Sequence, residues 1–264
     1  MKYKIICKGA SHIGKHRGIN QDNYILDKKI LDSPKSMGCI PAHGTATFDY
    51  PFVAGVFDGM GGEERGEVAS FLAAQRAANI VVSEKPVDDL LRFCRVVNED
   101  ICQFTEINGL VAMGTTAAML LFGPKDIALC NIGDSKIFRI ADEKIEQISV
   151  DHYAVAAYGN KPPLSQNLGI PSNEIVIEPY VARGRYKNGD IYLLCSDGLT
   201  DMVSQDQIKE IVLGAPIEEA VEALVKAALE AGGKDNITVV LCLVEKAREN
   251  LLERLFRKEK VKGA

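Results

Sequence analysis

The hydrophobic positions of the chain follow two periods, one typical of strands and the other of helices. Short apolar runs of strand length recur at residues 2–7, 24–26, 53–57, 115–122, 127–131, 135–140, 175–182, 191–195 and 237–244. Apolar residues at helical spacing predict helices at residues 63–83, 86–106, 205–212 and 217–231. Strands therefore dominate both ends of the chain, and a pair of helices is inserted twice.

This order does not alternate strand with helix, so it favours an antiparallel α+β layering over a parallel sheet. Residues 28–50 carry several prolines and glycines and predict a hairpin excursion or a surface loop. Residues 151–174 have a similar composition and predict an irregular segment with at most one short helix. We find no internal repeat.

Composition narrows the class of protein. The 264 residues are 47% hydrophobic, enough for a full core, and the net charge of −5 gives no support for a nucleic-acid partner. The seven cysteines include no CxxC pair, which argues against a disulfide framework and a structural zinc site. The N-terminus lacks an apolar stretch of signal-peptide length, and no apolar run is long enough to cross a bilayer. We expect a cytoplasmic monomer without a transmembrane segment.

The chain ends in a highly charged tail, residues 246–264. Four apolar residues in it could form one stripe of a helix: Leu251, Leu252, Leu255 and Phe256. A solvated or loosely docked helix is the interpretation that we prefer. A partner-binding or weakly membrane-attracted segment is the alternative.

One stretch stands out chemically, the sequence VAGVFDGMGGEERG at residues 53–66. Its apolar run ends at Asp58, and Gly59, Gly61 and Gly62 follow. Glycine lets the backbone turn sharply and approach a ligand closely. A carboxylate at such a strand end, beside the carbonyl of Gly59, suits a hard cation. An acidic turn between a strand and a helix is the alternative.

Four aspartates share this setting, each at the end of an apolar strand beside a glycine or a tight turn: Asp58, Asp134, Asp197 and Asp235. Brought to one sheet edge, their charges would repel one another by several kcal/mol, which divalent cations would offset. Oxygen ligands without histidine or cysteine select Mg²⁺ or Mn²⁺ over zinc. The alternative is that each aspartate only ends its strand or caps its turn.

Five motifs, in their order and spacing, resemble the bacterial branch of the protein phosphatase 2C family, the metal-dependent serine/threonine phosphatases. They read VFDGMGG, MGTTAAMLLF, LCNIGDSKIFRI, LLCSDGLTDMV and GKDNITVVLCLV, and the resemblance covers residues 5–244. It implies a four-layer α-β-β-α sandwich, in which two central antiparallel sheets are flanked by helix pairs. A catalytic domain at residues 1–245, with a two-metal centre at one end, would then precede the tail.

The resemblance also implies roles for the metal ligands. Asp58 would bridge two Mn²⁺ or Mg²⁺ ions, and Gly59 would offer its carbonyl oxygen to one of them. Asp197 and Asp235 would hold the other ion. Asp134 matches a position that helps to bind a third metal in bacterial members.

Two residues of an earlier stretch, SHIGKHRGINQDNYIL at residues 11–26, complete the implied site. Asp22 would hold metal-bound water, and Arg17 would grip the substrate phosphate. Water between two divalent cations becomes a strong nucleophile near neutral pH, and a guanidinium suits two phosphate oxygens. Arg17 and Asp58 are thus the residues expected at the reacting phosphate.

Some positions depart from the family pattern. Met60 stands where some members have a histidine proton donor, and His12 and Gln21 replace acidic residues of the family in the stretch 11–26. His12 and His16 are candidates for the general acid that protonates the leaving oxygen, but we prefer to interpret them as surface histidines. Two further positions differ. Lys136 replaces an arginine, an exchange that we interpret as structural, and Tyr153 replaces a serine.

The resemblance implies a phosphatase that acts on phosphoserine and phosphothreonine of proteins and opposes a eukaryotic-like Ser/Thr kinase. The alternative is a catalytically silent member that binds phosphoproteins or a partner domain. A partner-switching regulator of the anti-anti-sigma type is a third hypothesis, but such enzymes usually carry sensor domains, which this length does not accommodate.

Overall fold

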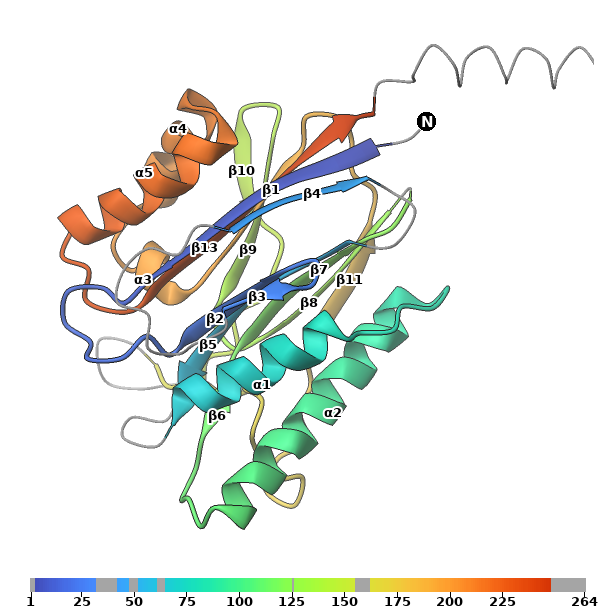
Figure 1. The fold of residues 1–264 in the computed structure, drawn as a ribbon, viewed down its shortest axis with the longest axis vertical. Helices are drawn as coiled ribbons and strands as arrows, with labels where there is room; N and C mark the ends of the chain where they lie inside the picture. Colours follow the sequence, from blue (N-terminus) through green and yellow to red (C-terminus); the bar gives the residue numbers. More distant parts are fainter. Residues whose placement is uncertain are drawn as a thin grey trace, which may run out of the picture.

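A computed structural model describes residues 3–31, 42–47, 52–60, 65–124, 126–154 and 162–247 (Figure 1). Two antiparallel sheets lie face to face. The first sheet runs in the order β10 (Lys144–Gln147), β9 (Lys136–Ala141), β12 (Ile191–Cys195), β13 (Ile237–Lys246), β1 (Tyr3–His12) and β4 (Ala42–Thr47). The second runs in the order β11 (Tyr180–Gly184), β8 (Ile127–Ile132), β7 (Ala117–Phe122), β5 (Phe52–Met60), β2 (Asp22–Leu26) and β3 (Lys29–Ile30), and β6 (Gly114–Thr115) pairs with the end of β5.

Helix pairs cover the two outer faces. The second sheet is covered by α1 (Gly66–Ala78) and α2 (Pro86–Ile107) (Figure 1). The first sheet is covered by α4 (Gln205–Gly214) and α5 (Ile217–Glu230), with the short α3 (Asp197–Thr200) at its end. The predicted four-layer α-β-β-α sandwich is therefore confirmed.

The strand β7 shows how one strand serves two cores. Its six residues are all buried, because successive side chains point to opposite faces of a sheet that is covered on both sides. Leu120 and Phe122 face the layer between the sheets, where the ring of Phe122 lies 6.0 Å from that of Phe52 and 5.5 Å from that of Tyr192. Met119 and Leu121 face the layer beneath α1 and α2.

Small residues let α1 lie close to its sheet. Ala69, Ala73, Ala74 and Ala77 are almost fully buried along one face of the helix. Side chains of this size allow the helix backbone to approach the strands, which leaves little room for a larger residue there.

Most predicted elements are confirmed within a few residues. The strand β12 has its predicted bounds, and α2 ends one residue after the predicted end. Residues 28–50 are predicted as a hairpin excursion or a surface loop. In their described part, β3 forms a hairpin with β2, and the edge strand β4 pairs with β1. The short β10 was not predicted.

The prediction of a strand at residues 175–182 is wrong for its first half. Ile175 and Val176 are 44% and 71% exposed, and regular pairing begins only at Tyr180. These residues have strand propensity but no buried face. Of the irregular 151–174 segment, the described part contains no helix.

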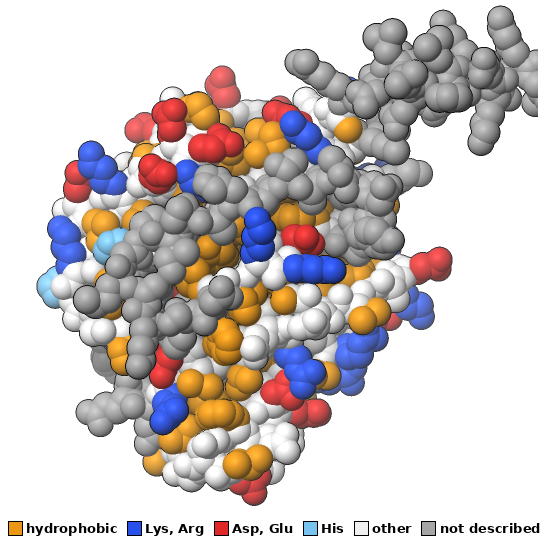
Figure 2. Space-filling model, viewed as in Figure 1, with side chains coloured by type: hydrophobic (Ala, Val, Ile, Leu, Met, Phe, Trp, Pro, Cys, Tyr) orange, Lys and Arg blue, Asp and Glu red, His pale blue; other side chains and the backbone are white. Residues whose placement is uncertain are grey.

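Other predictions lie partly outside the described residues. The tail is described only to Ala247, so its stripe of leucines and the domain boundary stay predictions. None of the six cysteines in the described part of the chain forms a disulfide. Among the described residues, no helix has the length and apolarity that a membrane span needs. Basic and acidic side chains are interspersed on the face shown in Figure 2.

The layer between the sheets should dominate stability. Leu120→Ala removes a fully buried side chain and should lower the free energy of unfolding by about 2–5 kcal/mol in urea titrations. Val81→Ala, at a side chain 76% exposed, is the matched control and should change it by less than about 0.5 kcal/mol. Equal effects of the two substitutions would contradict this assignment of the core.

Candidate metal centre

The second sheet brings two of the predicted residues directly together. Asp58 lies near the end of β5, and its partner across the antiparallel pair with β2 is Asp22. On its other side β5 continues in register with β6, so that Gly59 pairs with Thr115. Asp22, Asp58 and Gly59 therefore lie at the same end of this sheet.

The first sheet delivers two more carboxylates to that end. One residue separates Asp197 from the end of β12, and one residue separates Asp235 from the start of β13. These strands pair between Cys195 and Val239. Asp134 lies in the tight turn between β8 and β9. The turn therefore adds a carboxylate where the chain passes from one sheet to the other.

The pKa of Asp58 responds to the charges of the four other aspartates. Burial raises the pKa of Asp58 well above its usual range, and the charges of Asp22, Asp197, Asp134 and Asp235 raise it further. Burial likewise raises the pKa of Asp22 to about 7, against the lowering effect of two hydroxyl donors. Such mutual repulsion marks a site that is built for positive charge.

Arg17 is the cation that the described chain places there. Its Nη2 donates to Oδ2 of Asp235 at 2.6 Å. This hydrogen bond raises the pKa of Arg17, and the charges of Asp58 and Asp197 add to the effect. The side chain is 49% exposed, so the guanidinium can release Asp235 and bind another anion without a rearrangement of the core.

The donor set fits a hard divalent cation, although no ready-made cage exists. Among the described residues, no three Asp, Glu, His or Cys side chains are close enough together to enclose an ion. None of the hydrogen bonds of Asp58 to described residues involves its carboxylate. The nearby atoms that could bind a metal ion are carboxylate and carbonyl oxygens. A cation would satisfy that carboxylate and draw its neighbours together.

A buried set of hydroxyls holds Asp22 and joins the two sheets. Ser196, at the end of β12, donates to Oδ2 of Asp22 at 2.7 Å, and Thr238 of β13 donates to the same oxygen at 2.6 Å. Ser11 of β1 contacts the Thr238 hydroxyl at 2.7 Å. Oδ2 is thus occupied by the fold, which fixes the direction of Oδ1. The sequence analysis did not identify these hydroxyls, although Ser196 and Thr238 lie inside two of its motifs.

Hydroxyls also fix the backbone of Asp58. Its N–H donates to Oγ1 of Thr116 at 3.0 Å, and its carbonyl accepts from Oγ1 of Thr115 at 2.9 Å. Thr116 is in turn held by Ser135 at 2.7 Å. The TT pair of the second motif therefore acts on the strand that carries the central carboxylate.

Glycine is required at two points by close approach of the backbone. A Cβ on Gly59 would lie 2.2 Å from the carbonyl oxygen of Gly66 and 2.4 Å from that of Gln21. A Cβ on Gly198 would lie 1.9 Å from the carbonyl oxygen of Asn236. These contacts bring the N-terminal end of α1 and the 235–236 turn against the carboxylates.

The residues that depart from the family pattern have structural contacts. Nδ1 of His12 accepts the N–H of Gly14 at 2.9 Å, and burial lowers the pKa of His12, so it is a poor proton donor. The carbonyl of Gln21 accepts from Gly59 N at 3.1 Å and from Ser70 Oγ at 2.6 Å. Gln21 therefore contributes its backbone to this end of the sandwich.

The other departures lie around the β8–β9 turn. Lys136 pairs with Asp151, and the Tyr153 hydroxyl donates to Oδ2 of Asp134 at 3.3 Å. The tyrosine thus contacts one of the five carboxylates, which a serine would be too short to do from the same backbone position. Gly61 and Gly62 lie outside the described residues.

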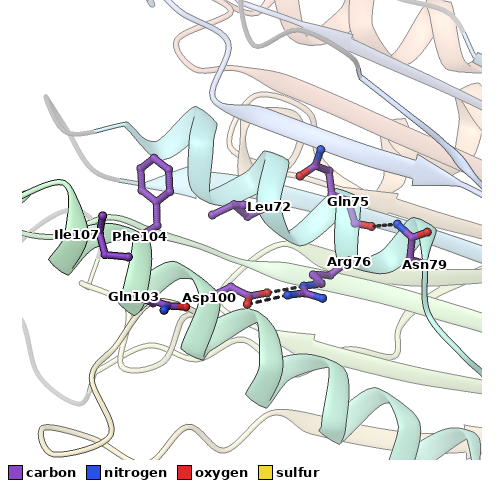
Figure 3. A pocket seen from close by; sticks show the side chains of 8 residues that line it. All are labelled: Leu72, Gln75, Arg76, Asn79, Asp100, Gln103, Phe104 and Ile107. Carbon is purple, nitrogen blue, oxygen red and sulfur yellow. Dashed lines mark hydrogen bonds and ion pairs between the residues drawn. The ribbon is translucent and has the colours of Figure 1, made fainter.

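One cavity of the described chain lies away from these carboxylates. This cavity, of about 610 Å³, lies between α1 and α2. Two of its lining residues, Arg76 and Asp100, are joined by hydrogen bonds of 2.5 and 2.9 Å (Figure 3). None of the five carboxylates lines it. This cavity is therefore separate from the predicted metal centre.

Comparison with known proteins agrees with this geometry. The model of the family described as Protein phosphatase 2C matches residues 42–242. The chain belongs to the protein phosphatase 2C family. It is 33% identical over 199 residues to the serine/threonine protein phosphatase PstP of Mycobacterium tuberculosis, covering 70% of this chain and 38% of PstP. It is 31% identical over 206 residues to the protein phosphatase PhpP of Streptococcus pneumoniae, covering 70% of this chain and 82% of PhpP.

Solved structures extend the likeness to most of the fold. The catalytic domain of PstP in complex with two manganese ions has a TM-score of 0.74 at 28% identity, over 92% of this chain and 100% of that domain. PppA of Pseudomonas aeruginosa, a regulatory component of a type VI secretion system, has a TM-score of 0.74 at 25% identity, over 91% of this chain and 97% of PppA. The 2C phosphatase fold is therefore shared along nearly the whole described chain.

The hydroxyls on Asp22 should matter for metal binding. Ser196→Ala combined with Thr238→Val removes both donors and should weaken Mn²⁺ binding, measured by calorimetry, by about 10- to 100-fold, the usual cost of losing an outer-shell partner. Thr105→Val removes a hydroxyl from α2 and is the control. Unchanged Mn²⁺ affinity in the double variant would show that the hydroxyls serve folding alone.

The raised pKa of Asp22 predicts a pH dependence of stability in EDTA. Between about pH 4 and pH 7 the folded state keeps a proton on Asp22 that the unfolded chain releases, so this group lowers stability as the pH rises. The free energy of unfolding of Asp22→Asn, relative to the native chain, should therefore increase from pH 5 to pH 8 in urea titrations. Asp206→Asn controls for loss of an exposed carboxylate. A difference between Asp22→Asn and the native chain that stays constant with pH would contradict the burial of this charge.

Proposed function

We propose that this 2C-family chain is a metal-dependent phosphatase that removes phosphate from serine and threonine residues of proteins. One observation carries the proposal: four other carboxylates, from both sheets and the turn between them, raise the pKa of Asp58, and Arg17 lies beside them. Of the two relatives described above, PstP is named a serine/threonine protein phosphatase and PhpP a protein phosphatase. The chain spans 38% of the length of PstP and 82% of the length of PhpP.

The proposed ligands follow from the placement of the residues. Asp58 and the carbonyl of Gly59 would hold one ion. Asp58 would also hold a second ion, together with Asp197 and Asp235. Asp134 would help with a third ion, and Asp22 would hold water near the centre. Bound Mn²⁺ or Mg²⁺ would supply a water of lowered pKa as the nucleophile and offset charge on the phosphate.

Arg17 would bind and orient the phosphate. Its guanidinium can donate two parallel hydrogen bonds to phosphate oxygens, a geometry that an ammonium cannot match. In the structure the same group holds Asp235, so it lies at the metal centre before any substrate arrives. Exchange of Asp235 for phosphate would leave that carboxylate to a cation.

The residues here limit which group can protonate the leaving oxygen. Met60 has no proton to donate, and His12 uses Nδ1 as an acceptor. The proton would therefore come from solvent held at the centre. Phosphorylated proteins are the proposed substrates, and a Ser/Thr kinase is the proposed counterpart, in the cytoplasm.

A catalytically silent, phosphoprotein-binding member is the alternative. The substitutions at His12 and Gln21 favour it, but the five carboxylates and Arg17 argue for turnover, because a protein that only binds has no need of such repulsion. Hydrolysis of p-nitrophenyl phosphate separates these two hypotheses.

With Mn²⁺ the chain should hydrolyse both p-nitrophenyl phosphate and a phosphothreonine peptide, and EDTA should abolish both activities. Asp197→Ala removes a proposed ligand and should lower kcat/KM by more than the roughly 10- to 100-fold typical of an outer-shell loss. Asp206→Ala, on the exposed face of α4, should retain full activity. A metal-replete chain inactive on both substrates would overturn the proposed function.

A further inference from the structure

A second cavity, of about 580 Å³, begins at the strand that carries Asp58. We call it the Met60 groove. The C-terminal part of α2, the 111–114 segment and the 167–174 segment form its walls. Its lining residues include Met60, Glu106, Val111, Gly169, Ile170 and Glu174.

Hydrogen bonds to backbone groups hold the walls of the groove in place. Leu168 exchanges two hydrogen bonds with Thr115, of 2.9 and 3.0 Å. The nearly buried Asn98 accepts from the N–H groups of Gly169 and Ile170 at 2.7 and 3.1 Å and donates to the Ile170 carbonyl at 2.9 Å. The groove is therefore preformed in the described chain, which lowers the cost of binding an extended segment.

Position links the groove to the reaction. Asp58 and Met60 are two residues apart in β5, so their side chains leave the same face of the strand about 7 Å apart. An extended peptide rises by a similar distance over two residues. A peptide with its phosphorylated residue at Asp58 can thus place a side chain two to four positions away in the groove.

The chemistry of the groove is apolar with an acidic rim. Met60, Val111, Ile170 and their neighbours supply apolar surface, and Val111 is 87% exposed. Glu106 and Glu174 carry the only charges among the described lining residues, and both are exposed. Such a surface complements a segment that carries an apolar and a basic side chain.

We propose that the Met60 groove selects substrates by binding an apolar and a basic residue two to four positions from the phosphorylated serine or threonine. This inference rests on the proposed function and names the substrate class for it. Met60, where the chain departs from the family pattern, then forms the edge of a specificity site that lies next to the reacting phosphate.

The test compares phosphothreonine peptides that differ only at the flanking residues. One set carries Leu and Lys two to four positions before or after the phosphothreonine, and the other carries Ser and Glu at the same places. Values of kcat/KM are measured with Mn²⁺, and peptide binding is measured in parallel by fluorescence anisotropy. The Leu/Lys peptides should be favoured by about five- to tenfold on at least one side, as expected for one or two exposed charge pairs.

A charge-reversed variant assigns the preference to the groove. Glu106→Lys with Glu174→Lys changes two exposed side chains, and a lysine in the last turn of α2 suits the helix dipole, so folding should survive. This variant should lose or invert the preference in both measurements while p-nitrophenyl phosphate hydrolysis stays unchanged. Glu146→Lys with Glu210→Lys, on the exposed side of β10 and α4, makes the same change in net charge and should keep the preference.

The outcomes separate the two proposals. Equal kcat/KM and equal binding for both peptide sets, with p-nitrophenyl phosphate hydrolysed, would overturn the groove and leave the phosphatase intact. A binding preference that Glu106→Lys with Glu174→Lys abolishes, without hydrolysis of any substrate, would support the groove and overturn the phosphatase. A preference that both double variants alter equally would assign it to net charge and overturn the groove.

Discussion

Repulsion among carboxylates at one end of a β-sandwich is the constraint on which the rest of this structure depends. Burial raises the pKa of Asp58 and four neighbouring charges raise it further, so the folded chain holds together groups that would separate in water. Three hydrophobic layers, one between the sheets and one beneath each helix pair, supply the free energy that opposes this repulsion. The hydroxyls of Ser196, directly after β12, and of Thr238 in β13 donate hydrogen bonds to Asp22 of β2. The same carboxylate that repels its neighbours therefore also links the two sheets.

Fold class and most elements could be predicted because burial leaves a periodic trace in the sequence. The strand β12 and the helix α2 have clear apolar patterns, and both form as predicted. The edge strand β4, with the sequence AHGTAT, has no such pattern, and only its pairing with β1 identifies it as a strand. The opposite failure occurs at Ile175 and Val176, whose strand-like side chains remain exposed.

The site could be predicted as a set of residues but not as an arrangement. Each aspartate sits in a local strand-end pattern, yet only the pairing of Asp22 with Asp58 shows that residues far apart in sequence share one place. The hydroxyls of Ser196 and Thr238 carry no distinctive local signal, since serine and threonine are common beside turns. The Met60 groove is assembled from three separate segments and therefore leaves no contiguous motif to read.

The central claim is that these carboxylates converge on shared cations. Crystals grown with Mn²⁺ and measured at the manganese absorption edge test it most directly. The account predicts at least two anomalous peaks at this end of the sandwich, one of them in contact with Asp58, Asp197 and Asp235 together, with Arg17 released from Asp235. No peak there, or peaks in which Asp58 and Asp197 contact no common ion, would contradict it.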